Sequence, residues 1–300
     1  MPEVIKSRTF LYISLLADIL IATSKFVGSA LTNSSSMKAE AIHSVIDAVS
    51  QLLLIWGDKS SKRPADSDRP FGYGPELYYW SLIVSLVIFI LGGCISVYEG
   101  IVHIQHPKFE GDPFWNYIIL GIAFAFNFIS MLSALKAFNS QRNSTGFWRA
   151  LISTKDPSTI IVLLGDIGDL IGLVIAFLGV FFGSLFQNPK LDGYASVAIG
   201  VLLLVISGFL IRESKSLLLG ETISIRTKRR LIKLAKKDNA ITNIKKVSSI
   251  YRSPDDAMVI IYVQFNNMIS MTELTDAIER ITRKIQMEFP QIKQVVIAPA

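Results

Sequence analysis

Residues 158–184 read STIIVLLGDIGDLIGLVIAFLGVFFGS, and Asp166 and Asp169 are the only ionisable residues in that stretch. A helix needs roughly 20 mainly apolar residues to cross the hydrocarbon core of a bilayer. A charged side chain near the centre of such a helix costs roughly 2.5–3.5 kcal/mol on insertion scales. The stretch therefore predicts a transmembrane helix, and its two aspartates are candidates for a functional site.

Five other apolar runs are long enough to span a bilayer. The predicted transmembrane helices are residues 9–32, 34–57, 77–104, 113–138, 158–184 and 192–212. Hydrophobic residues make up 51% of the chain and charged residues 18%, whereas soluble domains carry about 25% charged residues. We therefore predict an α-helical membrane protein with six transmembrane helices, in a domain of residues 1–212.

Lysine and arginine are distributed unevenly among the predicted loops. The N-terminal segment and the loops 58–76 and 139–157 hold most of them, while the opposite ends carry only Lys38, Lys108 and Lys190. Because cytoplasmic loops are enriched in Lys and Arg, we expect both termini and both long loops to face the cytoplasm. No secretory signal or targeting presequence is evident, so we expect a multi-pass protein of the cytoplasmic (cell) membrane.

The tail, residues 213–300, is charged and patterned like a soluble domain. We expect it to be a cytoplasmic α/β domain of order α-β-β-α-β, a compact sheet with helices on one face. Because it is small, docking to a second copy would help it fold. Its periodicity predicts helices at 227–238 and 272–288 and strands at 241–251, 258–265 and 294–298.

His43 and Asp47 form a second ionisable pair, within the predicted helix 34–57. Residues three or four apart share one helical face, so His43 and Asp47 point together, as do Asp166 and Asp169. At about 1.5 Å of rise per residue, both pairs lie near the middle of the bilayer. If the two faces meet, one imidazole and up to three carboxylates converge.

Carboxylates gathered in this way cannot all stay ionised in a site of low dielectric constant, so protons or a cation must neutralise them. Imidazole with carboxylate is a suitable ligand set for zinc, and metal binding expels protons from its ligands. A site open alternately to each side would exchange metal for protons, which is the antiport hypothesis. Buried aspartates can instead be structural. We interpret Asp18 as a structural partner of Lys25, and the structural alternative stays open for Asp169.

Several motifs along the chain resemble those of the cation diffusion facilitator family, in the branch with the mitochondrial-type zinc transporter and its bacterial relatives. The resemblance covers nearly the whole chain, tail included. It rests on Ala39-Glu-Ala-Ile-His-Ser-Val-Ile-Asp47, Arg69-Pro-Phe-Gly-Tyr-Gly74, Tyr98-Glu-Gly100 with His106-Pro107, Asp156-Pro157, Asp192-Gly-Tyr-Ala-Ser196 and Leu219-Gly-Glu221.

The resemblance implies a homodimeric metal–proton antiporter with a ferredoxin-like cytoplasmic domain and a four-ligand site between the second and fifth helices. His43 and Asp47 match the first pair of ligands, and Asp166 matches the family's aspartate on the fifth helix. Val162 stands where many members have a histidine, so Asp169, or water, would supply the fourth ligand. An oxygen-rich set leaves manganese or iron(II) as alternatives to zinc.

Other candidate sites carry weaker signals. The loop acids Asp66 and Asp68 are interpreted as a solvated turn, and the tail has neither histidine nor cysteine, which argues against a zinc-sensing cluster there. The basic segment 226–237 is interpreted either as a solvated face or as a surface for anionic lipid.

Transport is the leading function, with a non-transporting, metal-binding regulatory or scaffold protein as the alternative. No nucleophile constellation, resident cofactor or nucleic-acid partner is expected, so we do not expect an enzyme.

Overall fold

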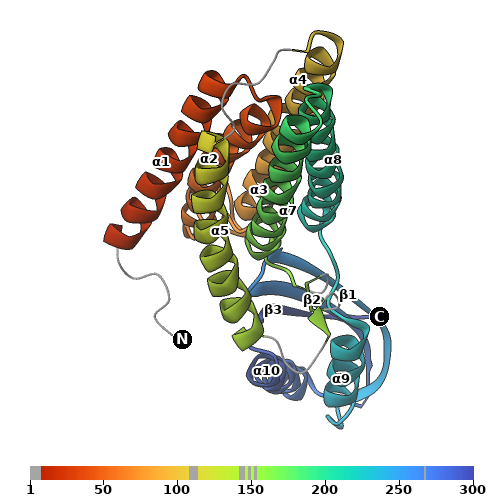
Figure 1. Cartoon of the computed structure of the whole chain (residues 1–300). Coiled ribbons are helices and arrows are strands. Elements are labelled where there is room, and N and C mark those ends of the chain that lie inside the picture. The colour runs from red at the N-terminus through yellow and green to blue at the C-terminus, as the bar shows by residue number, and fades with distance from the viewer. Residues whose placement is uncertain (1–7, 108–113, 142–145, 148–149, 152–153, 267) are drawn as a thin grey trace. The chain divides into compact units, whose positions relative to one another are not determined.

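The structure is a computed structural model that describes residues 8–107, 114–141, 146–147, 150–151, 154–266 and 268–300 (Figure 1). Its contacts divide the chain into two compact units. The first comprises residues 1–57, 80–152 and 157–214, and the second comprises residues 58–79, 153–156 and 215–300. The boundary predicted between residues 212 and 213 stays a prediction.

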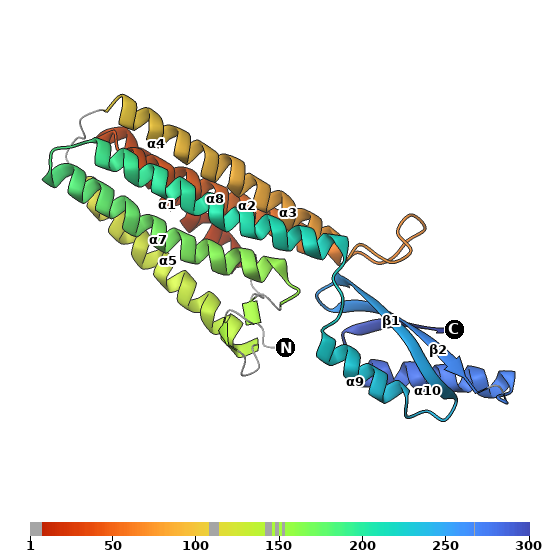
Figure 2. The ribbon, with the colours of Figure 1, turned by 90° about the vertical axis from the view of Figure 1, so that its right-hand side faces the viewer.

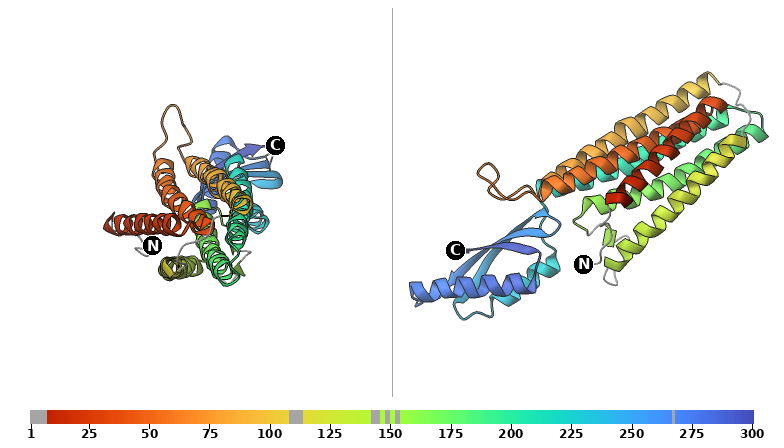
Figure 3. Two further views of the ribbon diagram at one scale, coloured as in Figure 1. Left: turned by 45° about the horizontal axis from the view of Figure 1, so that its top comes forward. Right: turned by 90° about the vertical axis from the view of Figure 1, so that its left-hand side faces the viewer.

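The first unit is a bundle of long helices, seen close to end-on in the left view of Figure 3. Five stretches are long and apolar enough to cross a membrane, and they correspond to five of the predicted spans: Ser35–Ser61, Glu76–Gln105, Phe114–Lys136, Pro157–Leu185 and Lys190–Leu219. Within α1, the shorter apolar stretch Ile19–Thr32 is the part described in full. A multi-pass helical membrane protein is therefore confirmed, and a sixth span stays a prediction. The helices that lie wholly or mostly in this unit are α1 (Arg8–Thr32), α2 (Ser35–Ser61), α3 (Glu76–Val87), η1 (Ile88–Cys94), α4 (Ile95–Gln105), α5 (Phe114–Gln141), α7 (Pro157–Leu185) and α8 (Lys190–Leu219).

Large apolar side chains point outward from the bundle. Ile129 is 63% exposed and Val205 is 67% exposed, whereas Leu163, Leu173 and Ile199 are buried. A soluble bundle keeps its large apolar side chains inside, because exposed apolar surface is unfavourable in water. Helices that are apolar on both their inner and outer faces are typical of a bundle surrounded by lipid hydrocarbon.

The third span contains a π-helical segment, η1, between α3 and α4. From η1 onward this span lies beside α8 (Figure 2), and glycines bring the two backbones into close contact. A Cβ atom on Gly100 would lie 2.8 Å from the carbonyl oxygen of Gly193, and one on Gly200 would lie 2.9 Å from that of Gly93. Glycine is required at these positions, because small residues let transmembrane backbones approach closely.

The tail forms a three-stranded mixed sheet, with strand order β1-β2-β3 and helices α9 and α10 on one side (Figure 2). Strands β1 and β2 pair antiparallel, and β2 and β3 pair parallel. The element order matches the prediction, while the ferredoxin-like comparison stays a prediction. The tail elements are α9 (Ile225–Ala235), β1 (Ile241–Ser253), β2 (Asp256–Phe265), α10 (Met271–Glu288) and β3 (Ile292–Pro299).

Alternate residues of β2 form the centre of the tail's core. Val259, Ile261 and Val263 are fully buried, as expected for one face of a strand whose side chains alternate. They pack with Leu231 of α9 and Ile285 of α10. Helix α10 begins at a capping box in which Ser270 and Glu273 bond reciprocally to each other's backbone N–H groups.

A glycine turn leads from α8 toward this sheet. Gly220 has φ +95°, and a Cβ atom there would overlap the side chain of Ile250. Only glycine adopts this left-handed conformation at low cost. The loop before α3 also contacts the hairpin of β1 and β2: the guanidinium of Arg252 lies over the ring of Phe71, 5.7 Å from its centroid.

Candidate metal centre

The N-terminus of α2 is fixed by a carboxylate from α8. Asp192 is completely buried and accepts hydrogen bonds from the backbone N–H and the hydroxyl of both Ser35 and Ser36, and from the hydroxyl of Ser34. The first N–H groups of a helix have no partner within the helix and carry partial positive charge, so a carboxylate is a suitable cap. This cap sets the depth of His43, two turns further along α2.

His43 contacts its predicted partner Asp47 and one member of the second predicted pair, Asp169. Its Nδ1 lies 3.0 Å from Oδ1 of Asp169 on α7, and its Nε2 lies 3.6 Å from Oδ1 of Asp47. Among the described residues these three form a group whose ligand atoms all lie within 4.8 Å of one another. The His43 side chain is 2% exposed, and those of Asp47 and Asp169 are 23% and 13% exposed. The imidazole thus lies between two carboxylates from different helices.

The donor atoms of this group fit a metal ion. His43 Nδ1 and Asp169 Oδ1 are buried and face each other. Donors around a tetrahedral zinc ion, bound at about 2.0–2.2 Å, lie roughly 3.3 Å from one another, so a bound ion would draw the ligand atoms of the group, which lie within 4.8 Å of one another, closer together. One imidazole binds a metal through one nitrogen, so a bound ion would replace one of the two carboxylate contacts.

Asp166 lies outside this group. It is half-buried, one turn before Asp169 on α7, and it is not among the residues whose ligand atoms meet. Val162, which stands where the family's histidine would be, is 41% exposed. The geometry therefore assembles His43, Asp47 and Asp169, and it leaves a role for Asp166 as a prediction.

A buried ion pair near this group was not predicted. Lys25 of α1 donates to Glu40 Oε2 at 3.0 Å and to Ser44 Oγ at 2.8 Å, and both ionised side chains are fully buried. Asp18, the predicted partner of Lys25, has its side chain outside the described residues. Glu40 precedes His43 by three residues, and that spacing was the signal available to place it on the same helical face.

The loop acids form a self-contained turn. Asp66 accepts hydrogen bonds from the Tyr73 hydroxyl at 2.7 Å and from the backbone N–H groups of Asp68 and Arg69. The hydrogen bond from Tyr73, followed by that from Arg69, lowers the pKa of the Asp66 carboxyl. This exposed carboxylate already has protein partners, and it belongs to no ligand group among the described residues.

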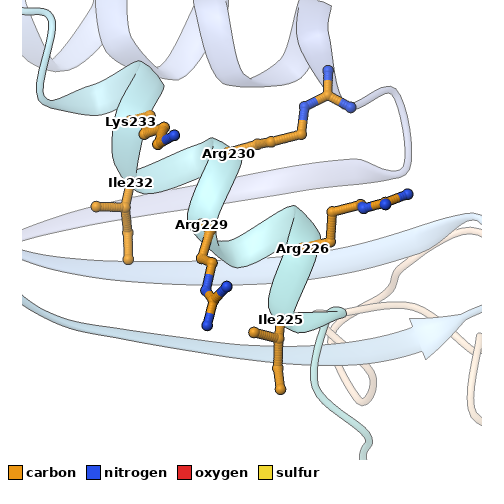
Figure 4. A pocket seen from close by; sticks show the side chains of 6 residues that line it. All are labelled: Ile225, Arg226, Arg229, Arg230, Ile232 and Lys233. Carbon is orange, nitrogen blue, oxygen red and sulfur yellow. The ribbon is translucent and has the colours of Figure 1, made fainter.

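The tail carries an open groove along α9, with a volume of about 570 Å³ (Figure 4). Its lining combines basic and apolar side chains and has no carboxylate, so it offers no cation ligands. The lining residues are Ile225, Arg226, Arg229, Arg230, Ile232 and Lys233.

Comparisons with known proteins agree with this membrane architecture. The mouse protein named proton-coupled zinc antiporter SLC30A9, mitochondrial, is 33% identical over 227 residues, which are 75% of this chain and 40% of that protein. Metal tolerance protein C4 of Arabidopsis thaliana is 25% identical over 262 residues, 85% of this chain and 56% of that protein. The manganese efflux system protein MneP of Bacillus subtilis is 22% identical over 225 residues, 72% of this chain and 70% of that protein.

The chain matches less than half of the length of the mouse relative. A family-level match is more extensive, because residues 11–219 match the cation efflux transmembrane domain. That range contains all three grouped residues and the buried ion pair. The chain therefore belongs to the cation efflux family, the cation diffusion facilitators.

Proposed function

We propose that this protein carries a divalent cation, zinc in the first place, out of the cytoplasm in exchange for protons. The observation that supports this most directly is the position of His43 between Asp47 and Asp169, on two helices long and apolar enough to span a bilayer. Ionisable groups in such helices are expensive and typically mark ion pathways. The name of the mouse relative, a proton-coupled zinc antiporter, is consistent with this proposal.

The coupling follows from charge. Two carboxylates in a site of low dielectric constant need a cation or protons to balance them. When a metal ion binds, the imidazole and the carboxylates must be deprotonated, so binding releases protons. When the metal leaves, two protons, one on the imidazole and one shared by the carboxylates, would replace its two positive charges. If the site faces each side of the membrane in turn, metal moves one way and protons the other.

The metal is zinc in our proposal, with manganese or iron(II) as the alternative. Two of the three grouped ligands are carboxylates, and harder cations such as manganese accept oxygen ligands readily. The name of the Bacillus subtilis relative, a manganese efflux system protein, is consistent with that alternative. Asp166 on α7, or a water molecule, would complete a four-ligand set.

Reconstituted proteoliposomes test the proposal. The full chain should take up zinc when a proton gradient is imposed, and a dye inside the vesicles should report proton counterflow. Asp47→Ala should abolish metal binding and flux, while Asp58→Asn, at an exposed ion pair with Lys62, serves as the control. Metal binding without flux in sealed vesicles would favour the scaffold alternative. A competition series with zinc, manganese, iron(II) and cobalt identifies the ion.

The remaining architecture is part of the same proposal. It comprises six spans with α1 as the first, both termini in the cytoplasm, and a homodimer joined by a ferredoxin-like tail. The tail, residues 213–300, has neither histidine nor cysteine, so we assign it dimer contact without metal sensing. The expected location is the cell membrane, although the mouse relative is mitochondrial by name.

Anionic lipid is the proposed partner of helix α9. Arg226, Arg229 and Lys233 are exposed along α9, and Arg229 points to the same side as Ile225, which is 71% exposed (Figure 4). The link from the end of α8 to α9 is five residues, a reach of roughly 20 Å. Basic clusters directly after a transmembrane helix typically bind acidic headgroups.

A further inference from the structure

The pair formed by Lys25 and Glu40 differs from ordinary ion pairs in its burial. Both side chains are 0% exposed, with Lys25 Nζ 3.0 Å from Glu40 Oε2. Desolvating an ammonium and a carboxylate costs about as much as their mutual attraction returns, so such a pair is a weak source of stability. Its position relative to the metal centre suggests a different role.

Lys25 holds the turn of α2 that presents His43. Its ammonium bonds to Glu40, three residues before His43, and to Ser44, the residue after it. These two contacts join α1 to both flanks of the imidazole. A shift of Lys25 would therefore move the helical turn on which the predicted metal ligand is mounted.

Glu40 also marks the close approach of α2 to α7. Its second oxygen, Oε1, is buried and has no hydrogen-bond partner among the described residues. This oxygen lies against Gly172, where a Cβ atom would collide with it. Gly172 follows Asp169 by three residues, just as Glu40 precedes His43 by three. The unpartnered carboxylate oxygen therefore lies one helical turn from the contact between His43 and Asp169.

The charges of Lys25 and Glu40 interact electrostatically with the residues of the metal centre. Lys25 interacts electrostatically with Asp47 and with Asp169, and Glu40 interacts with His43. Such interactions are strong where water is excluded. With Lys25 and Glu40 balancing each other, the group of one neutral imidazole and two carboxylates carries two negative charges, which match one divalent cation.

We propose that Lys25 and Glu40 are positioning residues that keep the net charge of the metal centre at two negative charges. The Lys25 ammonium pairs with the Glu40 carboxylate, and this ion pair prevents Glu40 from acting as a further metal ligand. This inference rests on the proposed function, since it concerns the same metal centre. Without Lys25, Glu40 would add a third negative charge one turn away, and the site would hold its cation too tightly to release it.

Zinc affinity of the purified full chain, measured by competition with a fluorescent chelator, tests the charges separately. Lys25→Met removes a positive charge, so affinity should rise about tenfold and turnover in proteoliposomes should fall. Glu40→Gln leaves the ammonium unbalanced, so affinity should fall about tenfold. The double variant removes both charges, and its affinity should return to within about threefold of the unaltered chain.

A second lysine–glutamate pair offers a matched control. Lys38, also on α2, lies 2.8 Å from Glu99, but these side chains are 42% and 28% exposed. Lys38→Met and Glu99→Gln should change zinc affinity by less than about twofold, because solvent screens exposed charges. If Lys25→Met does not yield a folded protein, Lys25→Gln removes the same charge and keeps a hydrogen-bond donor.

Opposite shifts that cancel in the double variant support the inference, because a purely structural pair would weaken binding in both single variants. Shifts in the same direction, or no shift in either, overturn it. A double variant with affinity lowered by more than about tenfold overturns it as well. Asp47→Ala separates the two levels of proposal: if that variant still binds zinc, the proposed metal centre itself is wrong.

Discussion

Nδ1 of His43 on α2 lies 3.0 Å from Oδ1 of Asp169 on α7, and both atoms are buried. This contact joins two helices that are far apart in the sequence. It identifies Asp169 as a carboxylate of α7 that contacts the imidazole, although the family pattern points to Asp166.

Replacing these aspartates separately tests which one binds metal. Asp169→Asn should lower zinc affinity on the order of 100-fold, because it removes a charged ligand from the group. Asp166→Asn should lower it by less than about tenfold, because this residue lies outside the group. Isothermal titration calorimetry of both purified variants provides the measurement. An equal loss of zinc affinity in both variants would mean that Asp166 binds the metal as Asp169 does.

Metal binding should weaken as the pH falls. The ligands bind metal only when deprotonated, so protons compete with the cation for His43 and the carboxylates. Titrations in buffers with different ionisation enthalpies count the protons released. His43→Gln should release fewer protons than the unaltered chain. Affinity that stays constant from neutral to mildly acidic pH would contradict proton coupling at this site.

Asp192→Asn should destabilise the helical bundle. The substitution removes the charge of a fully buried carboxylate that accepts hydrogen bonds from the start of α2. Hydrogen bonds to charged groups contribute about 1.5–3 kcal/mol each, so the melting temperature of the detergent-solubilised protein should fall by several degrees. Asp58→Asn, at an exposed pair, should leave it within about one degree. A cap that contributes nothing would give the two variants equal melting temperatures.

Gly220→Ala should destabilise the tail. The left-handed conformation disfavours a Cβ atom by roughly 1–2 kcal/mol, and the added methyl group would meet Ile250. Hydrogen exchange in the strands should accelerate in this variant. Gly208→Ala is the control, since a Cβ atom there has no neighbour within 4 Å. Unchanged exchange in Gly220→Ala would mean that the turn can relax.

Neutralising the α9 surface should weaken retention of anionic lipid. A variant with Arg226, Arg229 and Lys233 changed to Gln should lose protection of α9 from proteolysis in nanodiscs that contain phosphatidylglycerol, at about 1 kcal/mol per charge. The control changes Lys245, Lys284 and Lys293, which are exposed elsewhere on the tail. Equal protection in nanodiscs of phosphatidylcholine alone would contradict an electrostatic contact.

The sequence predicts most of the fold because its signals are local. Long apolar runs determine five spans, and alternation with turn residues determines the strands of the tail. In α10 the large apolar residues Leu274, Ile278, Ile281 and Ile285 recur at helical spacing and include two of the three buried positions, missing only Ala277. Alanine gives no amphipathic signal of its own, so a pattern of large apolar residues does not include it.

The site is predicted in part, for a physical reason. Spacing places Asp166 and Asp169 on one face of α7, but the rotation and depth of α7 against α2 depend on tertiary contacts such as Glu40 against Gly172. The partner of Lys25 is likewise set by how α1 lies against α2. Local sequence patterns do not determine how α7 is rotated against α2 or how α1 packs against α2.

The glycine contacts between the third span and α8 have a consequence for motion. Gly93 faces Gly200 and Gly100 faces Gly193, so two backbones touch at points seven residues apart along each helix. Neither helix can slide or rotate past the other without steric overlap, so the third span and α8 move as one rigid body. Any rearrangement that opens the metal centre to the other side of the membrane must then come from movement of the remaining helices relative to this rigid pair.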